Sequence, residues 1–269
     1  MSDLTGKVTA VTGGGGVLCS ALSRALAGQG ATVAVLDLMP EAAEKVVDEI
    51  RSAGGRAIAV EADVLRRQSL EQAAETIHRE CGPVDVLING AGGNKAEATA
   101  SPDKSFFDIP ADAIQWVFNL NCLGTILPCQ VFVPDMIEKQ QGVVINVASM
   151  AGIRPLTRVV AYSAAKAAIA NFTQWLAVHL AQEYSPKIRV NAIAPGFFLT
   201  AQNEYLLVDK ETGKPTPRGQ TILAHTPAGR YGLPDDLLGT LLWLVGDESA
   251  FVSGTVIPVD GGFAAFGGV

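Results

Sequence analysis

Short runs rich in valine and isoleucine alternate along the chain with longer stretches in which apolar residues recur every three to four positions. The short runs are apolar at successive positions, which is typical of strands that are buried on both faces of a parallel sheet. The predicted strands are Val8–Thr12, Thr32–Asp37, Arg56–Glu61, Val84–Asn89, Val143–Ala148, Ile188–Ala194 and Thr255–Val259.

The longer stretches have the spacing of amphipathic helices. Leu18, Leu22 and Leu26 share one face, and Gly30 follows as a stop signal. Repeated strand–helix alternation predicts an α/β fold with one doubly wound, Rossmann-type parallel sheet of about seven strands and helices on both faces. We expect residues 1–269 to form a single domain. Further helices are predicted at Ala43–Ile50, which Gly54-Gly55 ends, at Gln68–Cys81, and at Asp235–Val245, which Pro234 opens.

One long segment, at about 197–231, has no clear periodicity and contains several prolines and glycines. Segments of this length without regular structure are uncommon inside compact domains and are often functional. Parallel α/β sheets bind ligands at the carboxyl ends of their strands. We therefore predict that this segment is a lid over a substrate site.

Composition and charge narrow the class of protein. Apolar residues make up 48% and charged residues 17% of the chain, as in folded globular proteins. The net charge of −7, without a basic stripe, argues against a nucleic-acid partner. No signal peptide and no apolar run of ~18 residues are visible, so we expect a cytoplasmic protein without a membrane span. The four cysteines and three histidines lack metal or redox spacing, which predicts free thiols and no metal.

A run of glycines lies between the first predicted strand and the first helix. Such a turn lets the backbone approach a pyrophosphate at a helix N-terminus, although a plain tight turn also needs glycine. Asp37 ends the second strand, where a carboxylate about 20 residues past the glycines can bind the adenosine ribose and repel a 2′-phosphate. An exposed turn aspartate is the alternative, but in this context the cofactor is predicted to be NAD. The candidate phosphate contacts are Gly13, Gly15, Gly16, Val17 and Leu18.

Three residues form a candidate acid–base set. Tyr162 and Lys166 are four positions apart on one helical face, and Ser149 follows the fifth strand. A free tyrosine has a pKa of ~10, too high for a base near neutral pH. We expect the Lys166 ammonium and the positive nicotinamide to lower the pKa of Tyr162, while Ser149 holds the substrate oxygen. Taken alone, a Tyr-x-x-x-Lys pair is an ordinary feature of amphipathic helices.

Together these motifs resemble the short-chain dehydrogenase/reductase family over essentially the whole chain. Two of that family's loop glycines fall on Val17 and Cys19, so Gly14 to Gly16 are expected to make the tight turn, with Cys19 small enough for close packing. The resemblance implies a homotetramer built through helices near Asn121–Lys139 and Tyr162–Ser185. It also implies that Asp63 and Val64 contact the adenine and that the turn at Asn89, Ala91 and Gly92 runs alongside the cofactor. Asn121 is expected to kink a helix and to hold a relay water, and Tyr162 and Lys166 to contact the ribose. The nicotinamide is expected to contact Pro195, Gly196 and Thr200.

Several side chains are candidates for binding the substrate. Arg154 and Arg158 follow Ser149, and Lys95 follows the Asn89 turn, so their convergence predicts an anionic small molecule. For each of these, a solvated surface side chain is the alternative. Asn94, next to Lys95, is a further substrate candidate, and hydroxyl contacts are expected from His225, Gln202 and Asn203 in the lid.

Within that family, segments such as Arg154–Arg158 and Leu223–Pro227 resemble the D-mannonate oxidoreductases, also called D-fructuronate reductases. This resemblance implies that D-mannonate and NAD are converted to D-fructuronate and NADH. Gluconate-type acids and neutral sugar alcohols remain alternative substrates. A 3-oxoacyl-thioester reductase would usually prefer NADP, which Asp37 disfavours, and a non-enzymatic NAD-binding protein would be expected to lose part of the catalytic set.

Overall fold

The computed structural model describes residues 3–200 and 204–268. Seven strands form one sheet in the order β3-β2-β1-β4-β5-β6-β7, and every neighbouring pair is parallel. The predicted Rossmann-type sheet is therefore confirmed. The strands are β1 (Val8–Thr12), β2 (Thr32–Asp37), β3 (Arg56–Glu61), β4 (Val86–Asn89), β5 (Gly142–Val147), β6 (Ile188–Pro195) and β7 (Val256–Val259).

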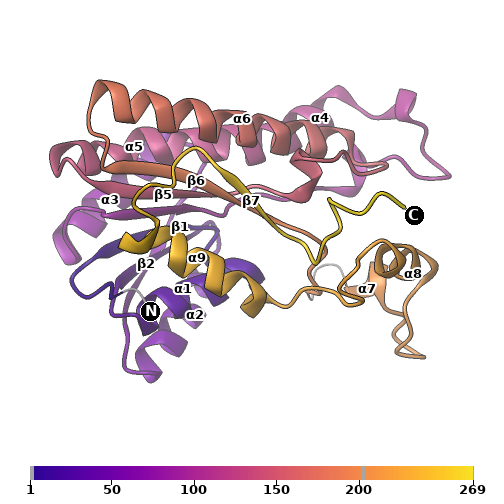
Figure 1. Ribbon diagram of the computed structural model, residues 1–269, viewed down its shortest axis with the longest axis horizontal. Helices are drawn as coiled ribbons and strands as arrows, with labels where there is room; N and C mark the ends of the chain where they lie inside the picture. Colours follow the sequence, from indigo (N-terminus) through magenta and orange to yellow (C-terminus); the bar gives the residue numbers. More distant parts are fainter. Residues whose placement is uncertain (1–2, 201–203, 269) are drawn as a thin grey trace.

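Helices cover both faces of the sheet (Figure 1). The strands supply apolar side chains alternately to the two sides because successive side chains point to opposite faces. In β2, Val33 and Val35 pack in one core, and Ala34 and Leu36 pack in the other. The first core holds α1 (Val17–Gly28), α2 (Pro40–Ser52) and α9 (Leu238–Val245), and the second holds α3 (Arg67–Glu80), α5 (Gly124–Glu138) and α6 (Val160–Glu183).

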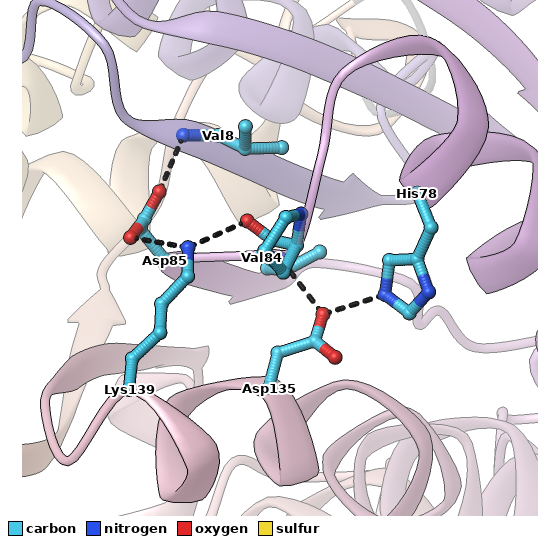
Figure 2. Close-up of polar contacts among 7 residues, drawn as sticks. Val8, His78, Val84, Asp85, Asp135 and Lys139 are labelled. Carbon is cyan, nitrogen blue, oxygen red and sulfur yellow. Dashed lines mark hydrogen bonds and ion pairs between the residues drawn. The ribbon is translucent and has the colours of Figure 1, made fainter.

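Strand β4 begins two residues later than predicted because buried carboxylates bind the backbone before it. The Val84 N–H donates to the Asp135 carboxylate at 2.7 Å, and His78 Nε2 lies 2.8 Å from the same oxygen. Asp85 accepts from the Val8 N–H at 2.9 Å and from Lys139 Nζ at 2.7 Å. Figure 2 shows these contacts joining the beginnings of β1 and β4 to α3 and α5. They fasten the amino edge of the sheet.

The predicted lid contains two short helices, α7 (Glu204–Leu207) and α8 (Pro217–Ala224). Thr216 is the N-cap of α8, and its hydroxyl accepts from the Gly219 N–H at 3.0 Å. Figure 1 shows α7 and α8 together with the C-terminal segment at one end of the sheet. The predicted hydroxyl contacts Gln202 and Asn203 lie outside the described residues.

The late helix also starts after its predicted boundary. Pro234–Leu237 forms a 3-10 turn, and α9 begins only at Leu238. The Asp236 carboxylate accepts from the Leu233 N–H at 2.8 Å and pairs with Arg230 at 2.6 Å. These bonds hold the first turn in its tighter form.

One helical run in the described chain, Ala111–Glu138, is long and apolar enough to cross a membrane by length and composition. Half of its most apolar window is buried inside the molecule. The run consists of α4 (Ala111–Phe118), a π turn (Asn119–Leu123) and α5, and α5 packs against α3. It therefore has the place of a core helix in this fold.

Candidate active site

The glycine turn after β1 makes a close approach to the turn after β4. The Gly13 backbone has a φ of 62°, and the Gly16 N–H donates to the Gly13 carbonyl at 3.0 Å. A Cβ added at Gly13 would lie 2.8 Å from the Ala91 Cα, so a side chain there has no room. Helix α1 then begins at Val17 after Gly16, and no side chain caps its first N–H groups, those of Val17 and Leu18 included. The predicted tight turn is confirmed.

Cys19, which occupies a usual glycine position on α1, packs against a glycine in the turn after β4. Cys19 is 4% exposed, and a Cβ added at Gly90 would overlap its sulfur. The thiol therefore fills space that a side chain at position 90 would otherwise take. Helix α1 and the turn after β4 therefore pack closely although Cys19 stands where the family usually has a glycine, as expected.

Asp37 lies beside this turn at the end of β2. Its carboxylate accepts from the Gly15 N–H at 3.0 Å and from the Met39 N–H at 3.0 Å. A negative charge next to the glycine turn suits ribose hydroxyls and opposes a 2′-phosphate.

The acid–base candidates come together at the carboxyl edge of β5. Ser149 follows the strand, its hydroxyl accepts from the Ala151 N–H at 3.1 Å, and the same hydroxyl lies near enough to the Tyr162 phenol to lower the pKa of that phenol. Lys166 Nζ lies 5.7 Å from the centre of the Tyr162 ring and donates to the Val147 carbonyl at 2.8 Å. Because Tyr162 and Lys166 both project from α6, one helix sets their relative position.

Burial decides the protonation of this set. Burial raises the pKa of Tyr162, and the nearby Ser149 hydroxyl opposes that rise only in part. Burial also lowers the pKa of Lys166 to about 8. The expected lowering of the Tyr162 pKa is therefore wrong for the protein chain on its own, because desolvation of the phenolate is the larger effect. The nicotinamide charge acts only when the cofactor is bound.

Asn121 lies in the π turn that interrupts the α4–α5 run. Its amide donates to the Val117 carbonyl at 2.8 Å and to the Gly93 carbonyl at 2.6 Å, and its oxygen accepts from the Gly93 N–H at 3.2 Å. A Cβ added at Gly92 would lie 2.7 Å from the Asn121 oxygen and 3.3 Å from Lys166 Nζ. The predicted helix irregularity is confirmed, and it brings the asparagine beside the lysine.

Polar side chains also cross the buried middle of the sheet. Asn89 donates to the Asn146 side-chain oxygen at 2.9 Å, and Asn146 donates to Thr173 at 2.9 Å. Thr12 accepts from the Gly90 and Ala91 N–H groups at 3.1 Å and 3.3 Å. Neither Asn146 nor Thr173 was among the site residues predicted from the sequence. An asparagine inside a valine- and isoleucine-rich strand was the signal that marked this position.

The remaining cofactor candidates lie on turns at the same edge. Asp63 accepts from the Leu65 N–H at 2.9 Å, and the buried Val64 packs against Gly124, where an added Cβ would lie 2.9 Å from it. Pro195 ends β6, and a Cβ added at Gly196 would lie 2.7 Å from the Asp260 Cα. Thr200 follows on the same segment and is half-buried.

The substrate candidates do not all converge. Arg154, Arg158 and His225 line one cleft of about 740 Å³. Lys95 instead lies over the Trp116 ring, 5.0 Å from its centre, and Asn94 donates to Thr99 at 2.9 Å. The predicted meeting of Lys95 with the two arginines is therefore not seen. Further lining residues, absent from the prediction, are Arg218, Phe197, Phe263 and Phe266.

In the described part of the chain, no group of three or more His, Cys, Asp or Glu side chains is placed to hold a metal ion. All four cysteines are free thiols, and burial raises the pKa of Cys19 and Cys129 to about 12.

Comparisons with known proteins agree with this geometry. A family described as short chain dehydrogenase matches residues 7–211. The uncharacterized oxidoreductase UxuB of Bacillus subtilis (strain 168) is 50% identical over 276 residues, which cover 99% of this chain and 98% of that protein. The 5-keto-D-gluconate 5-reductase of Escherichia coli (strain K12) is 31% identical, with 97% and 96% of the two chains covered.

A solved structure from Haemophilus influenzae, provisionally named a D-mannonate oxidoreductase, contains bound NAD. It is 49% identical to this chain, with a TM-score of 0.94 and coverage of 100% and 98% of the two chains. The side-chain-free cradle at Gly13 and the carboxylate of Asp37 beside Gly15 fit the same cofactor. The chain belongs to the short-chain dehydrogenase family and is an NAD(H)-dependent oxidoreductase.

Proposed function

We propose that the enzyme interconverts D-mannonate and D-fructuronate with NAD as the hydride carrier. The observation that carries this proposal is the charge of the 740 Å³ cleft. Among its described lining residues are three arginines and no aspartate or glutamate, although the chain has a net charge of −7. A cationic cleft in an acidic protein favours a substrate that bears a carboxylate.

The names of two relatives support the choice of acid. The Haemophilus influenzae structure carries the D-mannonate name, provisionally, and it covers the whole chain. A gluconate-type keto-acid is the second candidate, because the Escherichia coli relative reduces 5-keto-D-gluconate by name and a carboxylate would suit the same cleft. A neutral sugar alcohol would leave the arginines without an anion.

In this proposal the bound NAD accepts a hydride from the carbinol carbon of the substrate. Tyr162 takes the hydroxyl proton as the hydride leaves, and Ser149 holds the hydroxyl oxygen next to the phenol. The Lys166 ammonium binds the nicotinamide ribose and favours the phenolate, and Asn121 anchors a relay water beside it. The cofactor contacts are assigned to Gly13, Gly15, Gly16, Val17, Leu18, Asp37, Asp63, Val64, Asn89, Ala91, Gly92, Tyr162, Lys166, Pro195, Gly196 and Thr200.

The test is NADH oxidation at neutral pH with D-fructuronate, 5-keto-D-gluconate and a neutral keto-sugar, with NADPH assayed in parallel. We expect the largest kcat/KM with D-fructuronate and NADH. A larger value with 5-keto-D-gluconate would reassign the substrate within the sugar acids. Preference for the neutral sugar would contradict the anionic substrate, and preference for a 3-oxoacyl thioester with NADPH would replace the function altogether.

We also propose a cytoplasmic homotetramer. Large apolar side chains are exposed on the α4–α5 run and on α6, two elements that can pack against copies of themselves. Free cysteines suit a reducing compartment. Light scattering should give four times the 28.1 kDa chain mass, and a monomer mass would contradict the assembly. The exposed residues are Trp116, Phe118, Leu123, Val160, Trp175 and Val178.

A further inference from the structure

The cationic cleft has walls from four segments that are distant in sequence. The loop 154–158 follows β5, Phe197 follows β6, and Arg218 and His225 come from the lid helix α8 and its end. The fourth wall is the segment after β7, which contributes Phe263, Phe266 and two glycines. All four leave the carboxyl edge of the sheet, where Ser149 and Tyr162 lie.

Of the three arginines, Arg154 already has partners in the wall of the cleft. Its Nη1 atom donates to the Ala264 carbonyl at 3.2 Å and to the Phe266 carbonyl at 2.8 Å. These bonds tie the loop after β5 to a segment 110 and 112 residues away. Arg154 therefore shapes the cleft through the C-terminal wall.

His225 is held in a similar way. Its Nδ1 lies 2.7 Å from the Thr221 carbonyl, and its ring contacts those of Phe263 and Phe266 at centre distances of 6.4 Å and 5.8 Å. The imidazole is thus packed into the junction between α8 and the C-terminal wall.

Arg158 has an unfavourable backbone but an available side chain. Its φ is 72°, in the left-handed region that non-glycine residues rarely adopt, and the Ala100 N–H donates to its carbonyl at 2.9 Å. The side chain is exposed, and no carboxylate in the described residues pairs with it. Backbone strain of this kind gathers at ligand sites.

Arg218 also stands where the local structure does not favour it. It is the second residue of α8, and the positive end of a helix disfavours cations. Its side chain is exposed in the cleft and likewise has no carboxylate partner among the residues described. Neither arginine is explained by its own backbone or by an ion pair, and both line the same cleft.

We propose that Arg158 and Arg218 bind the substrate carboxylate from two walls, and that Arg154 is a positioning residue that holds the C-terminal wall; this rests on the sugar-acid function proposed above. Arginine presents paired N–H donors that match a carboxylate. Because Arg218 belongs to the lid and Arg158 to the loop 154–158 after β5, one carboxylate would join these two parts of the site. Substrate binding and lid position are then linked through a single anion.

The experiment compares an acid with its own methyl ester, so that only the charge differs. NADH-dependent reduction of D-fructuronate, of 5-keto-D-gluconate and of their methyl esters is measured for wild type, Arg158→Gln, Arg218→Gln and Arg154→Gln. Lys214→Gln is the matched control, since it removes an exposed cation from the same lid outside the cleft. Thermal unfolding and NADH binding by fluorescence check that each variant is folded and binds cofactor.

We expect Arg158→Gln and Arg218→Gln to raise KM for the acid by about 10- to 100-fold, the range for one charged hydrogen-bonding group, and to leave the ester unchanged. Arg218→Lys should recover only part of the loss, because an ammonium lacks the paired donors. Arg154→Gln should lower kcat/KM for acid and ester alike, since it loosens a wall. Lys214→Gln should match wild type.

The outcomes separate this inference from the proposed function. If wild type does not prefer either acid to its ester, the sugar-acid function itself is wrong. If wild type prefers the acid and Arg218→Gln keeps the same preference, the function stands and the role of Arg218 is refuted. An acid-specific loss in Arg154→Gln would refute the division of roles between the arginines.

Discussion

At the scale of single residues, burial explains most of the site's chemistry. Tyr162 and Lys166 have neutral forms that the protein interior favours, as the raised and lowered pKa values show. A phenol that stays protonated is ready to give its proton to a carbonyl substrate. A phenolate, which oxidation of an alcohol needs, depends on added positive charge from the cofactor and from Lys166.

Removing the phenol should abolish the reaction while sparing the cofactor. For Tyr162→Phe we expect kcat to fall by about 100- to 10,000-fold, the usual contribution of general acid–base catalysis. The dissociation constant for NADH should rise by no more than about tenfold, the range for one lost neutral hydrogen bond to the ribose, since the ring that lines the site is retained. Steady-state kinetics and fluorescence titration measure the two quantities. Activity close to wild type would remove Tyr162 from the role given to it.

Replacing Lys166 should move the pH profile in a defined direction. Alcohol oxidation needs ionised Tyr162, so its rate rises with pH until the tyrosine is deprotonated, and bound NAD brings a positive charge that lowers the tyrosine pKa. Lys166→Met removes a second group whose ammonium form, present below its pKa of about 8, favours the phenolate, so the rise in rate moves to higher pH. Lys166→Arg keeps the charge and serves as the control. The profile is read from kcat/KM for alcohol oxidation between about pH 6 and pH 10, and an unmoved acid limb in Lys166→Met would contradict the coupling.

At the scale of elements, the periodicity of apolar residues predicts the long elements well but does not reveal the short ones. The bounds of β1, β2 and β3 are those predicted from their valine- and isoleucine-rich runs. Helices α7 and α8 were missed because four and eight residues are too few to show a repeat. The late start of β4 could not be predicted, because it depends on a carboxylate from α5 that is distant in sequence.

The site shows the same division. Ser149, Tyr162, Lys166 and Asn121 were found because each has a fixed place in a motif, and the structure gathers them. Arg218 and the bonds of Arg154 to the C-terminal segment carry no local pattern. Contacts over 110 residues arise from the fold as a whole and are invisible in the spacing of one segment.

The fit between α1 and the β4 turn supports a paired prediction. Gly90→Ala should destabilise the protein by about 1 to 3 kcal/mol, because the new methyl group overlaps the Cys19 sulfur and lies 2.9 Å from the Thr12 carbonyl oxygen. Adding Cys19→Gly should recover the part of that loss that the sulfur causes, while the contact with the Thr12 carbonyl remains. Urea unfolding of the two single variants and the double variant gives the coupling. Simple additivity of the two effects would show that the residues do not share this space.

At the scale of the whole molecule, the functional residues lie at one edge of the sheet and a set of stabilising contacts lies at the other. The carboxyl edge carries the glycine turn, the acid–base set and the cationic cleft. The amino edge is joined by Asp85, Asp135 and their partners, which connect two strands to two helices (Figure 2). Stability can therefore be altered at one edge without touching the chemistry at the other.

Asp85→Asn should show this separation. The change weakens the bonds to the Val8 N–H and the Lys139 ammonium, and we expect a loss of about 2 kcal/mol in the free energy of unfolding. The kcat measured well below the unfolding temperature should stay at the wild-type value. Asp48→Asn, at an exposed acid on α2, is the control and should change neither quantity. A large fall in kcat would show that the two edges are coupled.

The π turn at Asn119–Leu123 has a consequence for insertions and deletions. A π turn holds one residue more than the α-helix around it, so deleting Leu120 would let the run close into a regular helix. Helical content would be kept. Because the extra residue is accommodated within a single turn, the helical segments on its two sides would keep their relative orientation, and the packing of α4 and α5 would be retained. Inside the turn, Asn121 would take a regular helical position and lose its bonds to Gly93, so a well-folded protein would lose its active site through the removal of one bulged residue.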